Sequence, residues 1–392
     1  MRERERVVRR LDQGLARARR RTRDMALLLV SMNGELTHDL EREFEGQLRR
    51  EDDLLPLGPD RFAVVAEDLR HVSDVLRISR RLRQKSGQRG LELRIAITHS
   101  ATPYADAQAM LAHAESTLAS LGPDELERLA NPQLHAEAAS RIELEAELGL
   151  ALERNQLEVY YQPIVELTHG RVCGFEALVR WPHPSRGILL PAEFLKVADE
   201  SGLMTRLDLM VMRQALARLR IWSDTRPVRL SLNLCPEHFT DPGRTDALLA
   251  VLQESGAPLG HVRLDVREEA VTDQTRQSSL KRLQDVDIGF HLDNFGMGTS
   301  SFLCLRSFPF ECLKVDRSLI FEMESEESCE LIASVLKVAA TMKMRTIAEG
   351  VTTHAQLEEL RALGCREAQG YLFAPPLDEE GATRILAEDP RW

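Results

Sequence analysis

Apolar positions follow two patterns along the chain, and the pattern changes near residue 156. Between residues 25 and 120, apolar runs at 25–30, 61–66 and 91–97 predict strands, while stretches at 70–84 and 106–119 predict helices. Gly122 and Pro123 then break the pattern. We therefore expect a small α/β domain over residues 25–123.

Two segments flank this domain. Residues 1–24 are rich in arginine, and Val7, Leu11 and Leu15 fall at helical spacing. The simplest interpretation is a solvated, partly frayed helix; the alternative is a surface that binds a protein partner, anionic lipid or nucleic acid. Residues 124–154 are rich in Ala, Glu and Leu and predict a linker helix.

From residue 155 to 392, short apolar runs alternate with amphipathic stretches. The runs that predict strands lie at 157–165, 172–179, 228–234, 262–266, 288–292, 311–315 and 346–348. The predicted helices lie at 191–200, 206–221, 245–254, 277–284, 327–342 and 353–363. Because parallel strands need crossover helices, this order predicts mostly parallel pairing. The number of repeats favours a closed TIM-like (β/α) barrel over an open sheet.

Polar side chains stand where the predicted barrel strands end. They are Glu176, Asn233, Asp265, Asp293, Lys314, Glu349 and Gln369. The carboxyl ends of parallel barrel strands meet on one face, so these groups should converge there. Crowded carboxylates repel unless a cation neutralises them, and hard oxygen ligands favour Mg²⁺ or Mn²⁺. Two such ions about 3.5–4 Å apart would activate water for displacement at a phosphodiester.

Composition narrows the function classes. The 62 acidic residues exceed the 51 basic ones, giving a formal charge of -11, which argues against nonspecific nucleic-acid binding. No apolar run reaches the ~18 residues of a membrane span, and the N-terminus does not read as a signal peptide. Six scattered cysteines, with no CxxC or Cys/His cluster, fit a reducing cytoplasm and argue against structural zinc.

Several motifs occur in a fixed order along the second half of the chain. They are YYQPIV at 160–165, EALVRW at 176–181, LLPAEF at 189–194, LKVDRS at 313–318, AEGV at 348–351 and QGYLF at 369–373. Together these motifs resemble the EAL-domain family, which hydrolyses the bacterial second messenger cyclic di-GMP. The resemblance runs from about residue 138 to residue 386.

The resemblance implies a TIM-like barrel in which two divalent metal ions, Mg²⁺ or Mn²⁺, assist hydrolysis to the linear dinucleotide. By matching motifs, the first ion would be surrounded by Glu176, Asn233, Asp265 and Asp293, and the second would be bound at the position of Asn294. Lys314 and Glu349 match residues that assist the attacking water. Gln162, Arg180 and Gln369 match ligand contacts or neighbours of the site, and Glu268 matches the anchor of the loop after Asp293.

This chain departs from the family pattern near the expected metal site. Asn294 replaces an aspartate and offers one neutral oxygen, while Asp265 replaces a glutamate and is one methylene shorter. Arg267 replaces a small hydroxyl residue, and Met297 and Thr299 also differ from the usual loop residues. Because metal-assisted catalysis depends on position, these changes predict weakened or absent hydrolysis with ligand contacts retained.

The N-terminal domain resembles a shortened, degenerate GGDEF domain, the cyclase often fused to EAL. The sequence GPDRF stands at the signature hairpin, 58–62. Arg61 replaces the acid needed for metal binding, and Ser31, Met32 and Asn33 stand where a metal-binding aspartate is expected. We therefore expect a regulatory or dimerising module and no cyclase activity.

Three functions fit these residues. The first is a cytoplasmic cyclic di-GMP receptor with weak or absent turnover, and the second is a working metal-dependent phosphodiesterase. The third is an interaction scaffold that binds no messenger, since a fold alone does not fix function. The family resemblance also implies a homodimer.

Overall fold

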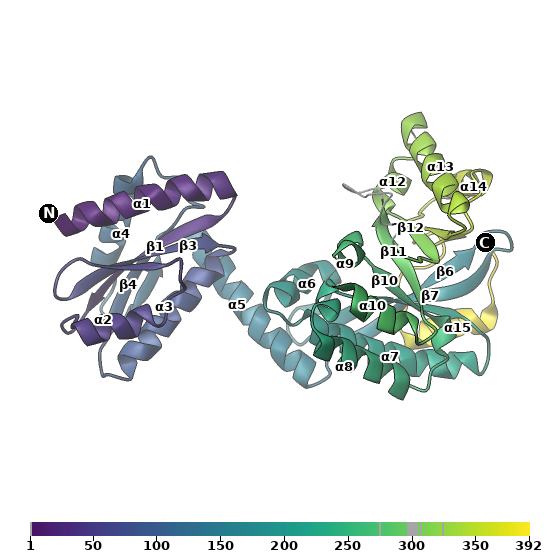
Figure 1. Cartoon of the computed structure of the whole chain (residues 1–392), viewed down its shortest axis with the longest axis horizontal. Helices are drawn as coiled ribbons and strands as arrows, with labels where there is room; N and C mark the ends of the chain where they lie inside the picture. The colour runs from purple at the N-terminus through teal and green to yellow at the C-terminus, as the bar shows by residue number, and fades with distance from the viewer. Residues whose placement is uncertain (1, 274–275, 296–304, 306–307, 324) are drawn as a thin grey trace. The chain divides into compact units, whose positions relative to one another are not determined.

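The computed structural model describes the chain except for residues 1, 274–275, 296–304, 306–307 and 324. The chain forms two compact units, Met1–Ala146 and Glu147–Trp392 (Figure 1). Among the described residues, no helix has both the length and the apolar character needed to cross a membrane.

The first unit is built on a mixed five-stranded sheet. Its strands are β1 (Asp24–Met32), β2 (Asp53–Pro56), β3 (Arg61–Leu69), β4 (Leu93–His99) and β5 (Glu127–Leu129), in the order β2-β3-β1-β4-β5. The central strand β1 pairs antiparallel with β3 and β4, while β4 and β5 are parallel. Because β1 is buried on both faces, it reads as a continuous apolar run.

Helices cover both faces of this sheet. On one face lie α1 (Arg2–Arg21) and α4 (Ala107–Ala119), whose apolar side chains share a core with one set of β1 residues. On the other face lie α2 (His38–Glu45), α3 (Val72–Gly87) and the start of α5 (Pro132–Glu153). Figure 1 shows α1 lying across β1 and β3.

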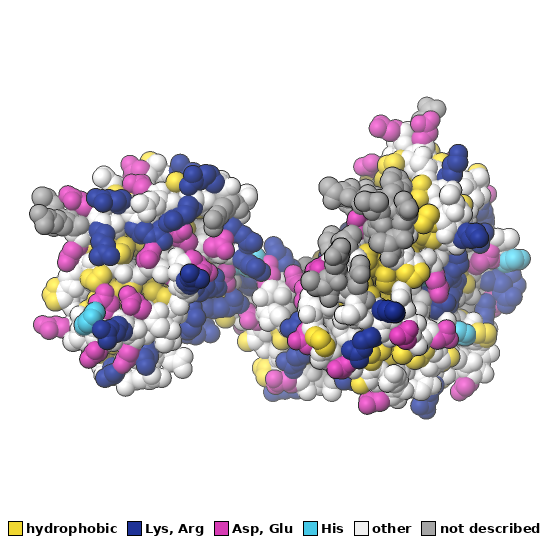
Figure 2. Space-filling view, viewed as in Figure 1, with side chains coloured by type: hydrophobic (Ala, Val, Ile, Leu, Met, Phe, Trp, Pro, Cys, Tyr) yellow, Lys and Arg dark blue, Asp and Glu magenta, His cyan; other side chains and the backbone are white. Residues whose placement is uncertain are grey.

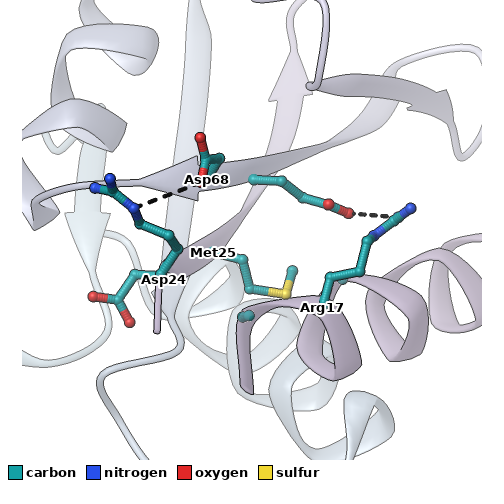
Figure 3. Close-up of a pocket in the computed structure, with 8 residues that line it drawn as sticks. Arg17, Asp24, Met25 and Asp68 are labelled. Carbon is teal, nitrogen blue, oxygen red and sulfur yellow. Dashed lines mark hydrogen bonds and ion pairs between the residues drawn. The ribbon is translucent and has the colours of Figure 1, made fainter. Parts of the chain in front are cut away.

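Helix α1 is part of the folded unit. Val7 and Leu11 are completely buried against the sheet, so the expected solvated helix is wrong for this face. Arg10 pairs with Asp53 and Glu67, and Arg17 Nη2 lies 2.8 Å from Glu67 Oε1 (Figure 3). On the face that Figure 2 shows, acidic side chains lie among the basic ones of this unit, so the basic surface there is interrupted.

The second unit contains a closed eight-stranded barrel. The strands are β6 (Glu158–Glu166), β7 (Arg171–His183), β9 (Arg229–Asn233), β10 (Val262–Val266), β11 (Gly289–Phe295), β12 (Cys312–Val315), β13 (Arg345–Ala348) and β14 (Glu367–Ala368). Pairing runs in parallel from β7 through β14, and β6 closes the circle antiparallel to both β14 and β7. The short strand β8 (Gly187–Leu189) extends only the outer end of β7.

Helical segments connect the barrel strands. They are α6 (Pro191–Glu200), α7 (Met204–Ser223), η1 (Pro236–Phe239), α8 (Pro242–Glu254), η2 (Leu259–His261), α9 (Glu268–Thr272), α10 (Gln277–Gln284), α12 (Arg317–Phe321), α13 (Glu326–Thr341), α14 (His354–Ala362) and α15 (Glu379–Glu388). Aromatic packing seats α7 on the barrel: the Trp222 ring centroid lies 4.8 Å from that of Phe175 and 4.9 Å from that of Tyr161. These contacts fix the hairpin β6–β7, which carries site residues.

Charged side chains also fill the other end of the barrel, where the parallel strands begin. Glu367 Oε1 lies 2.9 Å from Arg229 Nη2 and 3.0 Å from Arg345 Nη1, and Arg263 Nε lies 2.8 Å from Glu311 Oε2. In this group, arginines compensate the carboxylates one for one or better. The carboxyl ends of the strands carry a different balance of charge.

Candidate active site

A buried lysine lies at the centre of four carboxylates at the carboxyl ends of the parallel strands. Lys314 projects from β12 and is 1% exposed. Its Nζ lies 2.7 Å from Glu349 Oε1, 2.8 Å from Asp265 Oδ2, 3.4 Å from Glu176 Oε1 and 3.7 Å from Asp293 Oδ1. Side chains from five different barrel segments therefore meet at one ammonium group, as the strand ends predict.

Two amides hold these carboxylates in place. Gln369 Nε2 donates to Glu176 Oε2 at 2.6 Å and to Glu349 Oε1 at 3.2 Å. Asn233 Nδ2 donates to Glu176 Oε1 at 2.8 Å, and the Asn233 side chain is otherwise exposed. The buried Gln369 Oε1 has no hydrogen-bond partner among the described residues. It is an unused acceptor beside the acidic cluster.

Asp265 is shielded from solvent, and its two carboxylate oxygens contact an ammonium group and an imidazole. Besides its contact with Lys314, its Oδ1 lies 3.1 Å from His291 Nδ1. Burial alone would raise the pKa of Asp265, but Lys314 and His291 outweigh it and the pKa is lowered. The sequence reasoning did not identify His291, although alternation along β11 places residues 291 and 293 on one face.

The cluster holds an excess of negative charge. Burial raises the pKa of Glu349 to about 8, with Glu176 and Asp293 adding to the rise and Lys314 opposing it. Burial would lower the pKa of Lys314, but the four surrounding carboxylates raise it well above its usual value. One ammonium cannot neutralise four carboxylates, and the other donors are amide oxygens. This all-oxygen, anionic donor set fits a hard divalent cation.

The hairpin β6–β7 brings an arginine and an amide to the same region. Gln162 pairs across the hairpin with Glu176, and its Nε2 donates to Ala374 O at 3.4 Å. The buried Arg180 donates from Nη1 to Val179 O at 2.8 Å, and its guanidinium lies 5.6 Å from the Tyr160 ring centroid. Since Arg180 follows Glu176 by four residues, strand alternation puts both on one face.

A second aromatic ring lies near this arginine. Burial lowers the pKa of Arg180, while Tyr371 and Tyr160 act in the opposite direction. Tyr371 is 70% exposed, which is unusual for a large aromatic residue beside a buried charge. The sequence reasoning missed both tyrosines as site residues, although each lies two residues from a predicted one, Gln162 or Gln369.

Three other predicted features fall partly outside the described part of the chain. Asn294 belongs to β11, but its side chain lies outside the described residues, as do Met297 and Thr299. Glu268 is the first residue of α9, directly after Arg267 at the N-cap. The loop that Glu268 is expected to anchor again lies outside the described residues, so its anchoring role stays a prediction.

Known relatives align with different lengths of this chain. NbdA, a cyclic di-GMP phosphodiesterase of Pseudomonas aeruginosa, is 36% identical over 250 residues, which cover 62% of this chain and 32% of NbdA. MucR of the same species, a bifunctional diguanylate cyclase/cyclic di-GMP phosphodiesterase, is 28% identical over 400 residues, covering 95% of this chain and 58% of MucR. The chain spans between 31% and 37% of the length of the first three curated relatives.

A solved structure supports the same assignment for the barrel. The PaMucR phosphodiesterase in complex with c-di-GMP is 33% identical to this chain with a TM-score of 0.58, covering 61% of this chain and 99% of that one. The family model described as EAL domain matches residues 145–376, which contain the barrel and the whole acidic cluster. This protein therefore belongs to the EAL-domain family.

Proposed function

We propose that the chain is a cyclic di-GMP receptor that binds the messenger at the mouth of the barrel and hydrolyses it weakly or not at all. The observation that carries this proposal is that the buried Arg180 lies on β7, the strand that also carries Glu176 of the acidic cluster around Lys314. A buried arginine suits a phosphate, and the exposed Tyr371 ring offers a surface for a base. The relative PaMucR, solved with c-di-GMP, supports the choice of ligand.

The acidic cluster would hold Mg²⁺ or Mn²⁺ through Glu176, Asn233, Asp265 and Asp293. Such an ion, when bound, lowers the pKa of its water and offsets negative charge on a phosphodiester. Lys314 keeps Glu349, Asp265 and Glu176 close together although they repel one another. Gln369 orients Glu176 and Glu349 through its two donated hydrogen bonds. Glu349, held 2.7 Å from Lys314 Nζ, would accept the proton of the attacking water once a bound cation offsets the neighbouring carboxylates.

Weak turnover follows from two residues. Asn294, at the position of the family aspartate, lacks the negative charge that a second cation would need. Both carboxylate oxygens of Asp265 already contact Lys314 and His291. Because its side chain is one methylene shorter than that of glutamate, Asp265 is less able to coordinate a metal ion while keeping these contacts. Because displacement of a phosphodiester oxygen depends on accurate placement, a shift of about 1 Å costs roughly a hundredfold in rate.

A working phosphodiesterase is the second candidate. It is favoured by the 2.7 Å contact between Lys314 and Glu349, the two residues that match the water-activating pair. The relatives NbdA and MucR carry that activity in their names. A scaffold that binds no messenger is the third candidate, and it predicts that the Arg180 region has no ligand.

For the N-terminal unit we propose a GGDEF-like module without cyclase activity. The alignment with MucR, which extends over 95% of the chain, supports the relationship. The hairpin between β2 and β3 carries Arg61 at the start of β3, where a cyclase needs an acid. Leu36 N donates to Pro59 O at 2.6 Å, so the hairpin also packs on the segment after β1. Its role would be regulatory or dimerising.

One titration distinguishes the three candidates. Full-length protein is titrated calorimetrically with cyclic di-GMP, with and without Mn²⁺, and the mixtures are then analysed for the linear dinucleotide. Binding with little or no product supports the receptor; product accumulating over hours supports the enzyme. If cyclic di-GMP does not bind at tens of micromolar, the receptor and the enzyme are excluded and the interaction scaffold is the remaining candidate. Light scattering of the same samples tests the expected homodimer.

A further inference from the structure

A second group of ligand-type side chains lies where the chain leaves β9. Asp208 projects from α7, Cys235 directly precedes η1, and His238 lies within η1. All three are buried, and one ligand atom from each lies within 4.8 Å of the other two. The expectation that the cysteines form no Cys/His cluster is therefore wrong. The group shares no residue with the Lys314 cluster.

Backbone contacts hold these side chains in place. Asp208 Oδ2 accepts the Cys235 N–H at 2.8 Å and lies 3.2 Å from His238 Nε2. The carbonyl of His238 accepts from Thr245 Oγ1 at 2.9 Å, which ties η1 to α8. The carboxylate, thiol and imidazole are thus presented by packed elements, and the group does not depend on an exposed loop.

The hydrogen bonding of this group is incomplete. His238 is completely buried; its Nε2 faces Asp208 Oδ2 at 3.2 Å without hydrogen-bond geometry, and its Nδ1 makes no hydrogen bond with any described residue. Glu237 contacts the Cys235 thiol, and its buried Oε2 likewise has no hydrogen-bond partner in the described part of the chain. Buried polar atoms are nearly always satisfied, so unpartnered atoms of this kind require an explanation. A bound cation would take one ring nitrogen of His238 and give the Glu237 oxygen a partner.

We propose that Asp208, Cys235 and His238 bind a zinc ion. A thiolate, an imidazole and a carboxylate form a ligand set typical of Zn²⁺, whereas Mg²⁺ and Ca²⁺ take oxygen ligands. Tetrahedral zinc with bonds of about 2.0–2.3 Å places its ligand atoms roughly 3.3–3.8 Å apart, so only a small closure of the present group is needed. Three protein ligands leave the fourth tetrahedral position open. The neighbouring Glu237, which contacts the Cys235 thiol, would supply a further oxygen ligand there.

This site would have a structural role. It would link α7 to the segment that begins two residues after Asn233, and so hold the carboxyl end of β9 in place. Zinc binding here does not depend on the proposed messenger site, because no ligand residue is shared. Stability and metal content can therefore report on it without any assay of turnover.

Cobalt provides the test, because a cobalt–thiolate bond absorbs light where cobalt bound to carboxylates does not. The full-length protein is reduced, stripped of metal with a chelator, and titrated with Co²⁺ in excess Mg²⁺, which occupies oxygen-only sites. We expect one equivalent of Co²⁺ to give a thiolate charge-transfer band that Zn²⁺ abolishes. Cys235→Ser and His238→Gln should remove this band. Cys329→Ser is the matched control, since Cys329 Sγ donates to Met323 O at 3.0 Å, away from the cluster, and should leave the band unchanged.

Thermal unfolding in Zn²⁺ and in chelator completes the experiment. Zinc should raise the Tm of the wild type and of Cys329→Ser but not that of His238→Gln. Asp208→Asn keeps an oxygen for the Cys235 N–H, so it should remain folded while Co²⁺ binding weakens at least tenfold. A wild type without the charge-transfer band, or a band that persists in Cys235→Ser, overturns the proposal. If Cys235→Ser fails to fold, Asp208→Asn and His238→Gln still test the site, because unchanged Co²⁺ binding in both of them would contradict the proposal.

Discussion

The ammonium of Lys314 lies 2.7 Å from the carboxylate of Glu349, and both belong to a cluster in which three further carboxylates surround the same nitrogen. This relationship makes the lysine the only cationic side chain among the described contacts of Glu349, so the two residues depend on each other electrostatically.

Replacing Lys314 by Met should destabilise the metal-free protein by about 3–5 kcal/mol, because it leaves buried carboxylates without their cation. Mg²⁺ or Mn²⁺ should raise the Tm of this variant more than that of the wild type. Denaturant unfolding in chelator and in metal measures both effects. Glu349→Gln is the control: it removes one of the repelling carboxylates and should cost much less. Equal losses for the two variants would contradict this account of the cluster.

Restoring the family carboxylate with Asn294→Asp should raise turnover of cyclic di-GMP by about tenfold or more, since a second cation gains a charged ligand. Affinity for the messenger should stay within about tenfold of the wild-type value. Product analysis by chromatography and a calorimetric titration measure the two quantities. An unchanged rate would point to Asp265 or to the following loop as the limiting feature.

Arg180→Ala should weaken cyclic di-GMP binding tenfold or more, because a charged hydrogen bond contributes about 1.5–3 kcal/mol. Arg186→Ala is a matched control close by in the sequence, since Arg186 Nη2 lies 3.6 Å from Glu147 Oε2. Isothermal titration measures both variants. If Arg186→Ala weakens binding as much as Arg180→Ala, general loss of positive charge is the better explanation.

The pH dependence of stability should reflect Asp389. Hydrogen bonds from Arg171 and Arg226 lower the pKa of Asp389 to about 2, whereas it is about 3.9 in an unfolded chain. A carboxyl with a lowered folded-state pKa stabilises the fold above pH 4, and this contribution is lost as pH falls toward 2. Asp389→Asn should therefore be less stable than the wild type at pH 7, and the difference should shrink between about pH 4 and pH 2.

Asparagine is suited to this test because Asp389 has a φ of 48°, a conformation that asparagine adopts readily. Glu380→Gln, at an exposed residue of the same helix, serves as the comparison. Urea unfolding across this pH range gives the free energies. A difference between Asp389→Asn and wild type that stays constant down to pH 2 would show that the ion pairs do not stabilise the fold.

The sequence predicted the barrel because its long strands and helices have clear periodicity. The predicted strand at 262–266 and helices at 191–200 and 277–284 coincide with β10, α6 and α10. Strand β14 has two residues and β8 three, too few to produce a period, so neither range was predicted, although Gln369 was taken as a strand end. In α1, the spacing of Val7 and Leu11 indicated an apolar face, but its burial depends on the sheet beneath it and could not be predicted from this segment alone.

Some residues of the candidate site could be predicted from their position along the chain, and others only from the folded structure. Seven residues at strand ends could be found from position alone, because parallel strands share one carboxyl edge. Gln162 could not, since it lies inside the antiparallel strand β6, and only the family resemblance identified it. The Cys235–His238 pair was missed because its third member, Asp208, is supplied by a different helix.

The packing of α1 also has a practical consequence for recombinant work. The sequence alone would place the domain boundary after residue 24. A protein expressed from residue 25 would lack Val7 and Leu11, and the apolar side chains of β1 and β3 that they cover would be exposed to solvent. Such a fragment should aggregate, and its loss of function would say nothing about what the arginine-rich segment recognises.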